Sequence, residues 1–220
     1  MPFRDRTDAG RKLAAELLSY RNQRPIILAL PRGGVPVAAE VAKALRAPLD
    51  LILVRKIGAP MAPELAVGAV VDGGSPTIVS NPEIIRLTGT SEMQFQRICK
   101  EELAEIERRR HLFLGNRPPI DPRGRVVIVI DDGIATGATT RAALWAIRTH
   151  QPKKLVLAVP VGATNAINEL RHEVDDVICL KKLEPFGSVG YFYSDFRQLT
   201  DQDVIEIMDG FSPTDTAANM

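Results

Sequence analysis

One stretch of the sequence constrains the fold more than any other, and it reads VVIVIDDGIATGATT from Val126 to Thr140. Five branched apolar residues run directly into two carboxylates, and a segment of Gly, Ala and Thr with few bulky side chains follows. A strand in which every residue is apolar is typical of a parallel sheet that helices cover on both faces. The stretch therefore predicts a buried parallel strand that ends in an acidic turn of small residues.

Further apolar runs alternate along the chain with segments of helical periodicity. We expect helices at 11–20, 35–47, 91–114, 140–149 and 164–172, and strands at 25–30, 49–54, 126–130, 154–161 and 176–180. A DGG turn between two apolar runs predicts a hairpin over 64–79. This alternation predicts an α/β fold with a mostly parallel sheet and helices on both faces.

Composition and charge narrow the class of protein. The chain has 220 residues, 45% of them hydrophobic, and a formal net charge of +1. This length supports one substantial core, and the near-neutral charge gives no argument for a nucleic-acid or membrane partner.

The N-terminus lacks the apolar segment of a secretory signal, and Cys99 and Cys179 lack metal-ligand spacing. We expect a cytoplasmic protein with one domain over 1–220, a small hood formed by about 1–20 and 181–210, and a flexible tail at 211–220.

The turn after the central strand has the composition of a phosphate-binding loop. Ligands of open parallel sheets bind beyond the carboxyl ends of the strands, and the helix that follows presents free N–H groups and a positive dipole end. Glycine and alanine leave the backbone open to a ligand, and threonine adds hydroxyl donors. The residues concerned are Ala135, Thr136, Gly137, Ala138, Thr139 and Thr140.

The two carboxylates, Asp131 and Asp132, indicate which phosphate compound fits. No Lys-Ser/Thr pair follows Gly137, so this is not a Walker A loop, and the GxGxxG dinucleotide fingerprint is also missing. Two acids beside a phosphate would repel it unless they bind something else, and sugar hydroxyls or Mg²⁺ suit them. The stretch therefore predicts a ligand in which a phosphate lies next to a ribose diol.

Two acidic residues followed by ATGAT at the end of an apolar strand resemble the phosphoribosyl-pyrophosphate (PRPP) motif of type I phosphoribosyltransferases. The resemblance implies that Asp131 and Asp132 hold the ribose 2′- and 3′-hydroxyls, while residues 135–140 bind the 5′-phosphate. It also implies Mg²⁺ bound mainly through PRPP, with the same two carboxylates as candidate metal ligands. The resemblance covers roughly residues 25–200.

A second glycine-rich loop, LPRGG at 30–34, ends the first predicted strand. Gly33 and Gly34 expose consecutive amides beside Arg32, an arrangement that suits an anion. In the family that the chain resembles, the loop at this place binds pyrophosphate and often contains a cis non-proline peptide bond. The resemblance therefore implies a cis bond between Pro31 and Arg32.

A basic pair, Arg55 and Lys56, ends the next predicted strand in the segment VRK. Such charges are often only solvated caps, but the segment resembles the basic pair that reaches the pyrophosphate in adenine and orotate phosphoribosyltransferases. The segment 57–64 resembles their mobile catalytic loop, although it contains neither His nor a further Lys. Glu64 is its only ionisable side chain, so Glu64 is our candidate for handling a proton.

The segment EPFGSVGYFYSDFRQL at 184–199 concentrates aromatic residues in a chain that has few. It is compatible with a small satellite core, and it also resembles the hood of the 6-oxopurine enzymes, where a Phe, here Phe186, stacks on the base. The spacing from Phe186 to Gly190 is one residue longer than in those enzymes. Ala135 also stands where they keep a catalytic Asp. The identity of the base therefore stays open.

Together these segments predict an enzyme that transfers the 5-phosphoribosyl group of Mg-PRPP to a nitrogenous base and releases pyrophosphate, as in nucleotide salvage. The expected partners are PRPP and a nucleobase-like molecule, with a homodimer as the candidate assembly. Two alternatives remain: a PRPP-sensing regulator that binds nucleic acid with weak or no catalysis, and an enzyme acting on another ribose phosphate. The candidate catalytic residues are Arg55, Lys56 and Glu64.

Overall fold

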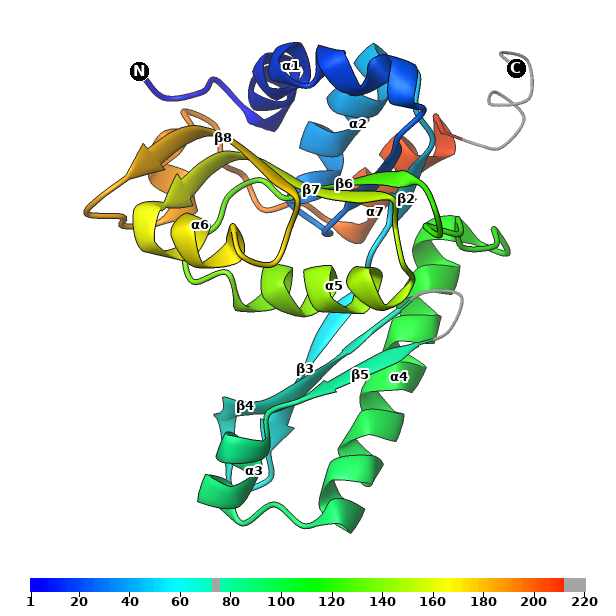
Figure 1. Cartoon of the computed structure of the whole chain (residues 1–220), viewed down its shortest axis with the longest axis vertical. Coiled ribbons are helices and arrows are strands. Elements are labelled where there is room, and N and C mark those ends of the chain that lie inside the picture. The colour runs from blue at the N-terminus through cyan, green and yellow to red at the C-terminus, as the bar shows by residue number, and fades with distance from the viewer. Residues whose placement is uncertain (73–75, 212–220) are drawn as a thin grey trace.

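Five strands form one sheet in which every neighbouring pair is parallel (Figure 1). The computed structural model describes residues 1–72 and 76–211. The sheet and the helices around it confirm the predicted α/β class. In spatial order the strands are β2 (Leu49–Leu51), β1 (Ile26–Ala29), β6 (Val126–Ile130), β7 (Lys154–Ala163) and β8 (Asp176–Leu183).

Helices cover both faces of this sheet (Figure 1). The helices α1 (Arg6–Glu16) and α2 (Gly34–Leu45) lie on one face, and α5 (Ala138–Thr149) and α6 (Thr164–Leu170) lie on the other. All five residues of β6 are buried, and they alternate between the apolar clusters of the two faces. Burial of an Ile or Val side chain contributes roughly 1.5–3 kcal/mol. Coverage on both faces therefore explains why the strand is apolar throughout.

The strand order reverses between β1 and β6, because the chain continues from β1 outward to β2 on one side and later to β6 on the other. The two strands pair in register up to Ala29 and Ile130, and the Leu30 N–H donates to the Ile130 carbonyl at 2.9 Å. The loops after β1 and β6 therefore leave the sheet side by side. A reversal point of this kind is the usual ligand crevice of an open parallel sheet.

A second, antiparallel sheet lies outside the first. It comprises β3 (Val54–Ala59), β4 (Ala62–Val71) and β5 (Thr77–Ser80), and it packs with α3 (Pro82–Thr88) and α4 (Glu92–Leu114). We call residues 54–114 the arm, which contacts α5 and extends away from the parallel sheet (Figure 1). The predicted hairpin and the long helix are both present. Most of the DGG turn lies outside the described residues.

One strand predicted at 49–54 is divided between the two sheets, so this prediction was wrong. The chain leaves the parallel sheet after Leu51 and enters β3 at Val54. Between them the Leu53 N–H donates to Asp72 Oδ1 at 2.6 Å, so a buried carboxylate at the end of β4 takes the place of a strand partner. Burial of a backbone N–H requires such a partner, and the sequence alone gave no sign of this one.

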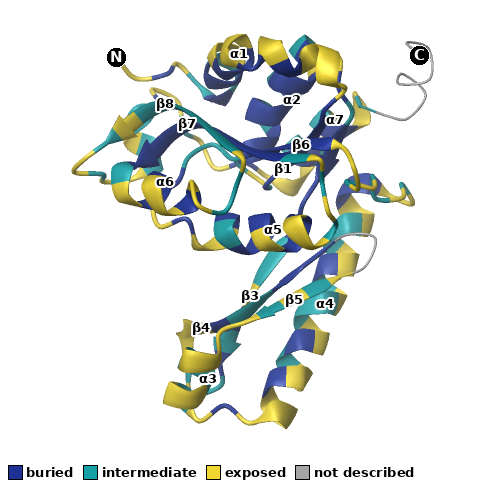
Figure 2. Cartoon of the chain, viewed as in Figure 1, coloured by how far each residue is buried: buried dark blue, intermediate teal, exposed yellow. Residues whose placement is uncertain are grey.

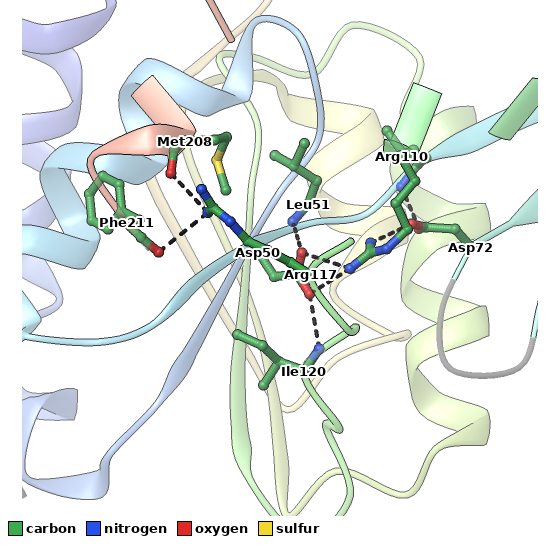
Figure 3. Close-up of polar contacts among 9 residues, drawn as sticks. Asp50, Leu51, Asp72, Arg110, Arg117, Ile120, Met208 and Phe211 are labelled. Atoms are coloured by element: carbon green, nitrogen blue, oxygen red, sulfur yellow. Dashed lines mark hydrogen bonds and ion pairs between the residues drawn. The ribbon is translucent and has the colours of Figure 1, made fainter. Parts of the chain in front are cut away.

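A largely buried arginine, Arg110, joins the arm to the parallel sheet (Figure 3). Arg110 of α4 donates through Nη1 to Asp72 at 2.8 Å and through Nη2 to both oxygens of Asp50 at 3.1 Å. Asp50 belongs to β2, and it also accepts the backbone N–H groups of Leu51 and Ile120. The base of the arm is therefore fixed by a charged cluster in which each carboxylate oxygen has a partner.

The two chain segments assigned to the hood do meet. Phe3 forms a parallel bridge with Tyr193, and the Ser194 N–H donates to the Phe3 carbonyl at 2.8 Å. The hood also contains the 3₁₀ helix η2 (Val189–Phe192) and the helix α7 (Asp201–Asp209), which the sequence analysis did not predict, as it did not predict α3. Residues 212–220, most of the predicted tail, lie outside the described residues.

The first helix begins earlier than predicted. We expected a helix at 11–20, whereas α1 starts at Arg6 because the Asp5 side chain caps it by accepting the Asp8 N–H at 2.7 Å. It ends at Glu16, and the 3₁₀ helix η1 (Leu18–Gln23) follows. None of the helices within residues 1–72 and 76–211 combines the length and the apolar character that crossing a bilayer requires.

Candidate functional site

The loops after β1 and β6 touch so closely that only glycine fits between them. A Cβ atom at Gly33 would lie 2.1 Å from Asp132 Oδ2, and one at Gly34 would lie 2.6 Å from the Ile130 carbonyl oxygen. Both distances are far below a van der Waals contact. The peptide bond between Pro31 and Arg32 is cis, as the family resemblance implied. The structure therefore brings the LPRGG loop and the acid pair into one site.

Asp131 and Asp132 are held in an environment that opposes their ionisation. Burial raises the pKa of Asp131 well above its usual range, and the neighbouring charge of Asp132 raises it further. Burial also raises the pKa of Asp132, although a hydrogen bond from Arg6 opposes that shift. Hydroxyl donors or a cation from a ligand would stabilise these two carboxylates in their charged form.

Arg6 is a site residue that the sequence analysis missed. Its Nε donates to Asp132 Oδ2 at 2.7 Å, and both side chains are almost fully buried, with exposed fractions of 10% and 13%. No spacing rule could find this contact, because 126 positions separate the two residues. The sequence placed Arg6 in the hood without assigning it a role.

Tyr193 binds the main chain of Asp132. Its hydroxyl donates to the Asp132 carbonyl oxygen at 2.6 Å. Burial, together with the negative charge of Asp132, raises the pKa of Tyr193, so the phenol stays a donor at any ordinary pH. The aromatic segment of the hood thus reaches the acid pair directly, although the sequence analysis singled out only Phe186 from it.

The turn between β6 and α5 has the open backbone predicted for a phosphate loop. Ala135, Thr136, Ala138 and Thr139 are exposed, while Thr140 is buried with an exposed fraction of 2%. Gly137 has φ of +76°, a conformation that favours glycine, and α5 begins at the next residue. The N–H groups of the first helical turn have no partner within the helix, which makes this end an anion-binding position.

The hood and β7 pack against the turn between β6 and α5. Ile134 exchanges backbone hydrogen bonds with β7, from its N–H to Val161 at 3.0 Å and from the Ala163 N–H to its carbonyl at 2.9 Å. A Cβ at Gly133 would lie 2.6 Å from a methyl group of Val189 in the hood. The turn is therefore rigidly placed, since both β7 and the hood fix its path.

Arg32 is partly exposed beside the hood helix α7. Its Nη1 lies 3.7 Å from Asp201 Oδ1 at the start of that helix, and the two side chains are 40% and 50% exposed. An exposed pair at this distance contributes little to stability. The arginine can therefore exchange Asp201 for an anionic ligand at little cost.

The predicted catalytic residues Arg55, Lys56 and Glu64 lie on the arm. Arg55 donates through Nε to Glu102 of α4 at 2.6 Å, and Lys56 Nζ approaches the Glu64 carbonyl at 3.4 Å. The structure groups these three residues on the antiparallel sheet, separately from the acid pair.

The segment 57–64 is not a loop, so this prediction was wrong. β3 and β4 form a hairpin whose pairing runs to Ala59 and Ala62, with the turn at Pro60 and Met61. Ile57 and Val67 are fully buried in the cluster that includes Phe95 of α4. This apolar face, which alternates along the strands, explains why the segment continues as a sheet.

Phe186 lies in the hood as part of a satellite core. Its ring stacks on Phe192 with centroids 5.1 Å apart, and both pack against the cluster of Phe3 and Tyr193. The ring is only partly buried. Its role as a platform for a base remains a prediction.

The donor set of the site suits Mg²⁺ held mainly by a ligand. No cluster of three or more His, Cys, Asp or Glu side chains with metal-binding geometry occurs in residues 1–72 and 76–211. Asp131 and Asp132 supply two carboxylates, and Mg²⁺ commonly uses one or two of these together with phosphate oxygens and waters. The residues present therefore fit this ion without a protein cage.

A hollow of about 590 Å³ between α1, α2 and α7 lies next to this site without being part of it. Arg6 lines it, but none of the residues of the two ligand-binding loops does. Among the described residues, its lining has five acidic residues against three basic ones, Arg6, Lys43 and Arg197, so a net negative charge opposes a phosphate there. The candidate site for a phosphorylated ligand is therefore the open end of β1 and β6.

The reversal point of a parallel sheet, next to a helix N-terminus, is where α/β proteins commonly bind phosphorylated ligands. A family model described as the phosphoribosyl transferase domain matches residues 4–196. The chain belongs to this family.

Two curated proteins from the CDC 1551 and H37Rv strains of Mycobacterium tuberculosis, both with a provisional phosphoribosyl transferase name, are 42% identical over 207 residues. The match covers 94% of this chain and 46% of each relative, so the chain spans about half the length of the curated relatives it matches.

Solved structures show the same fold. The protein TT1426 of Thermus thermophilus is 39% identical, with a TM-score of 0.81 over 96% of this chain and 100% of that one. The AQ2163 protein of Aquifex aeolicus is 12% identical, with a TM-score of 0.50 over 84% of this chain and 78% of that one. The second likeness shows the fold alone.

Proposed function

We propose that this chain binds Mg-PRPP at the carboxyl ends of β1 and β6 and transfers its 5-phosphoribosyl group to a nitrogenous base. The observation that carries the proposal is the contact between the two loops, where a Cβ at Gly33 would collide with Asp132. This contact joins a glycine-rich anion loop to a pair of acids. PRPP carries a pyrophosphate and a ribose diol on adjacent carbons, so it matches both halves of the site.

Each part of the ligand has a place in this assignment. The turn at 135–140 and the N-terminus of α5 bind the 5′-phosphate, while Asp131 and Asp132 accept hydrogen bonds from the ribose hydroxyls. The amides of Gly33 and Gly34, with Arg32, bind the pyrophosphate. Mg²⁺, when bound, would neutralise charge on the pyrophosphate oxygens.

The chain assists the reaction by holding the ring and stabilising the leaving group. Breaking the bond at the ribose C1 develops positive charge on the sugar and negative charge on pyrophosphate. Arg32 belongs to the loop that would hold this leaving group, and Arg55 and Lys56 of the arm are the further candidates. Holding the ribose between the acids and the phosphate turn supplies an orientation effect.

The acceptor base is not a 6-oxopurine in this proposal. Ala135 leaves no carboxylate in the phosphate turn, and the loss of a general base typically lowers a rate by about 10²- to 10⁴-fold. Stacking on Phe186 contributes only about 0.5–1.5 kcal/mol beyond area burial, so it does not offset that loss. We therefore expect weak or no turnover of hypoxanthine and guanine, and we assign proton handling to Glu64.

The test is release of pyrophosphate from PRPP across a panel of purines and pyrimidines with Mg²⁺. We expect turnover with at least one base other than hypoxanthine and guanine, abolished in Asp131→Asn. Glu64→Gln should lower the turnover strongly, and Phe186→Ala should mainly raise KM. No release with any base would contradict the proposed reaction, and efficient use of guanine that Glu64→Gln leaves unchanged would contradict the base assignment.

A further inference from the structure

The N-terminal segment places the guanidinium group of Arg6 against Asp132 of the acid pair. Arg6 lies in the first turn of α1, and its Nε donates to Asp132 Oδ2 at 2.7 Å. The two side chains are 10% and 13% exposed, so the pair is nearly removed from water. A buried pair of this kind is weak evidence for stability, because the desolvation of both ions offsets their attraction. Because stability alone does not account for this pair, its location beside the candidate ligand site indicates a role in ligand binding.

The guanidinium group of Arg6 is itself fixed from two further directions. Its Nη1 donates to the Arg197 carbonyl at 3.0 Å, and its Cζ lies 3.9 Å from the centre of the Phe196 ring. Both partners belong to the hood. An arginine held by a carbonyl, a ring and a carboxylate has few rotamers left, so it restricts the orientation of Asp132 in turn.

The backbone of Asp132 is restrained by the same hood. Tyr193 donates to the Asp132 carbonyl at 2.6 Å, and its ring stacks against Phe196 with centroids 5.1 Å apart. Phe3 also packs against Tyr193, with the two ring centroids 5.6 Å apart. The N-terminal segment and the hood thus hold both the side chain and the main chain of one acid.

We propose that Arg6 is a positioning residue that orients the Asp132 carboxylate toward a ribose hydroxyl. This inference rests on the proposed function. An ionised carboxylate has about four acceptor positions, and the Arg6 Nε bond uses one of them, which leaves acceptor capacity for a ligand. Gly33 is the necessary complement, because any side chain there would displace the same carboxylate.

The experiment compares two ligands that differ in the sugar. Dissociation constants for Mg-PRPP and for Mg-pyrophosphate are measured by calorimetry on the full chain and on Arg6→Gln. We expect the variant to weaken PRPP binding roughly 10- to 100-fold, the usual effect of removing a partner that orients a ligand-binding group, while pyrophosphate binding changes less than about 2-fold. Arg6→Lys, which keeps the charge, should recover part of the loss.

Arg11→Gln is the matched control. Arg11 lies on the same helix and also donates through Nε to a carboxylate, Glu40, at 2.8 Å, but it does not contact the acid pair. We expect this control to bind both ligands as the unaltered chain does. Tyr193→Phe provides a second variant that keeps the ring and removes only the hydroxyl, and we expect a smaller loss, confined to PRPP.

The outcomes separate the inference from the proposed function. If the unaltered chain binds PRPP and Arg6→Gln binds it equally well, the positioning role is wrong while the proposed function stands. Equal losses of PRPP and pyrophosphate in these variants would also overturn the inference, because they would indicate a merely structural effect. If the unaltered chain does not bind PRPP, the proposed function fails, and this inference fails with it.

Discussion

The end of the parallel sheet and the base of the arm both bury an arginine against carboxylates, but they use the arginine differently. At the base of the arm, Arg110 and backbone N–H groups occupy the oxygens of Asp50 and Asp72 (Figure 3). At the sheet end, Arg6 donates one side-chain bond to Asp132. Each carboxylate oxygen of the first cluster accepts a hydrogen bond from within the protein, whereas Asp132 accepts its bond from Arg6 through Oδ2 alone.

This difference indicates how a buried ionic cluster can be assigned a role. A cluster whose carboxylate oxygens all have partners within the protein, and whose arginine bridges two elements, serves to join two parts of the fold. A cluster with free acceptors next to an open backbone turn is incomplete until a ligand supplies donors. Burial alone does not separate the two. Asp50 and Asp72 are buried and the Asp132 side chain is 13% exposed, and the strands β1 and β6 that lead to the site are buried along their length (Figure 2).

The largest expected effect concerns the base of the arm. Arg110→Ala leaves Asp50 and Asp72 buried without a counterion, and removal of one partner from a buried pair typically lowers the free energy of unfolding by about 3–5 kcal/mol. Chemical denaturation measures this change, and Arg109→Ala, which removes a partly exposed pair with Glu105, is the control. Denaturation midpoints that are equal in the two variants would contradict the structural role.

The next effect concerns the contact between the two ligand loops. Gly33→Ala places a Cβ where Asp132 Oδ2 now lies, so the carboxylate must move. A displacement of about 1 Å at such a site can lower activity by about 100-fold, and we expect PRPP affinity to fall similarly. Gly210→Ala, whose Cβ would make an ordinary contact at 3.4 Å, should bind PRPP normally. Normal binding by Gly33→Ala would show that the two loops do not act together.

A smaller effect is expected from the acid itself. Asp132→Asn removes a charged acceptor, and a hydrogen bond to such a group contributes about 1.5–3 kcal/mol, or about 10- to 150-fold in affinity. The loss should appear for PRPP and hardly at all for free pyrophosphate, which has no sugar. Calorimetric titration with both ligands measures it. An equal loss for both would show that Asp132 does not bind the ribose.

The pH dependence of stability gives a further test of the cluster at the base of the arm. Burial raises the pKa of Asp72 from 3.8 to about 6, although Arg110 opposes the shift. The folded chain then binds this proton more tightly than the unfolded chain, so this group lowers the free energy of unfolding as the pH rises from about 4 to about 6, by roughly 1–3 kcal/mol. Denaturation at several pH values should show this contribution and its loss in Asp72→Asn. An identical pH profile for the variant would contradict it.

The sequence predicted the parts of the molecule that local chemistry determines. The strand Val126–Ile130, its acids and the small-residue turn are contiguous, so their periodicity and composition indicated a buried parallel strand and a phosphate loop. The glycines of the LPRGG loop belong to the same kind of pattern. Each of these features depends on neighbours along the chain, which is the information that sequence patterns contain.

The parts that depend on distant neighbours could not be predicted. Arg6 contacts Asp132 across 126 positions of the chain. Asp72 accepts the Leu53 N–H at the point where the chain passes from one sheet to the other. The segment 57–64 contains two prolines and resembles a mobile catalytic loop, yet packing of Ile57 against α4 keeps it in a hairpin. In the last two cases tertiary contacts overrode the local pattern.

The measurement that tests the central claim most directly is the thermal stability of the chain with Mg-PRPP. A ligand present at about 100 times its Kd adds about 2.7 kcal/mol to the free energy of unfolding, so Tm should rise clearly with PRPP and Mg²⁺ and much less with ATP or NAD. The rise should be lost in Asp131→Asn, which alters the site, and kept in Arg109→Ala, which alters the arm. No rise in Tm at millimolar PRPP and Mg²⁺, or a rise that Asp131→Asn retains, would contradict a phosphoribosyl site at the ends of β1 and β6.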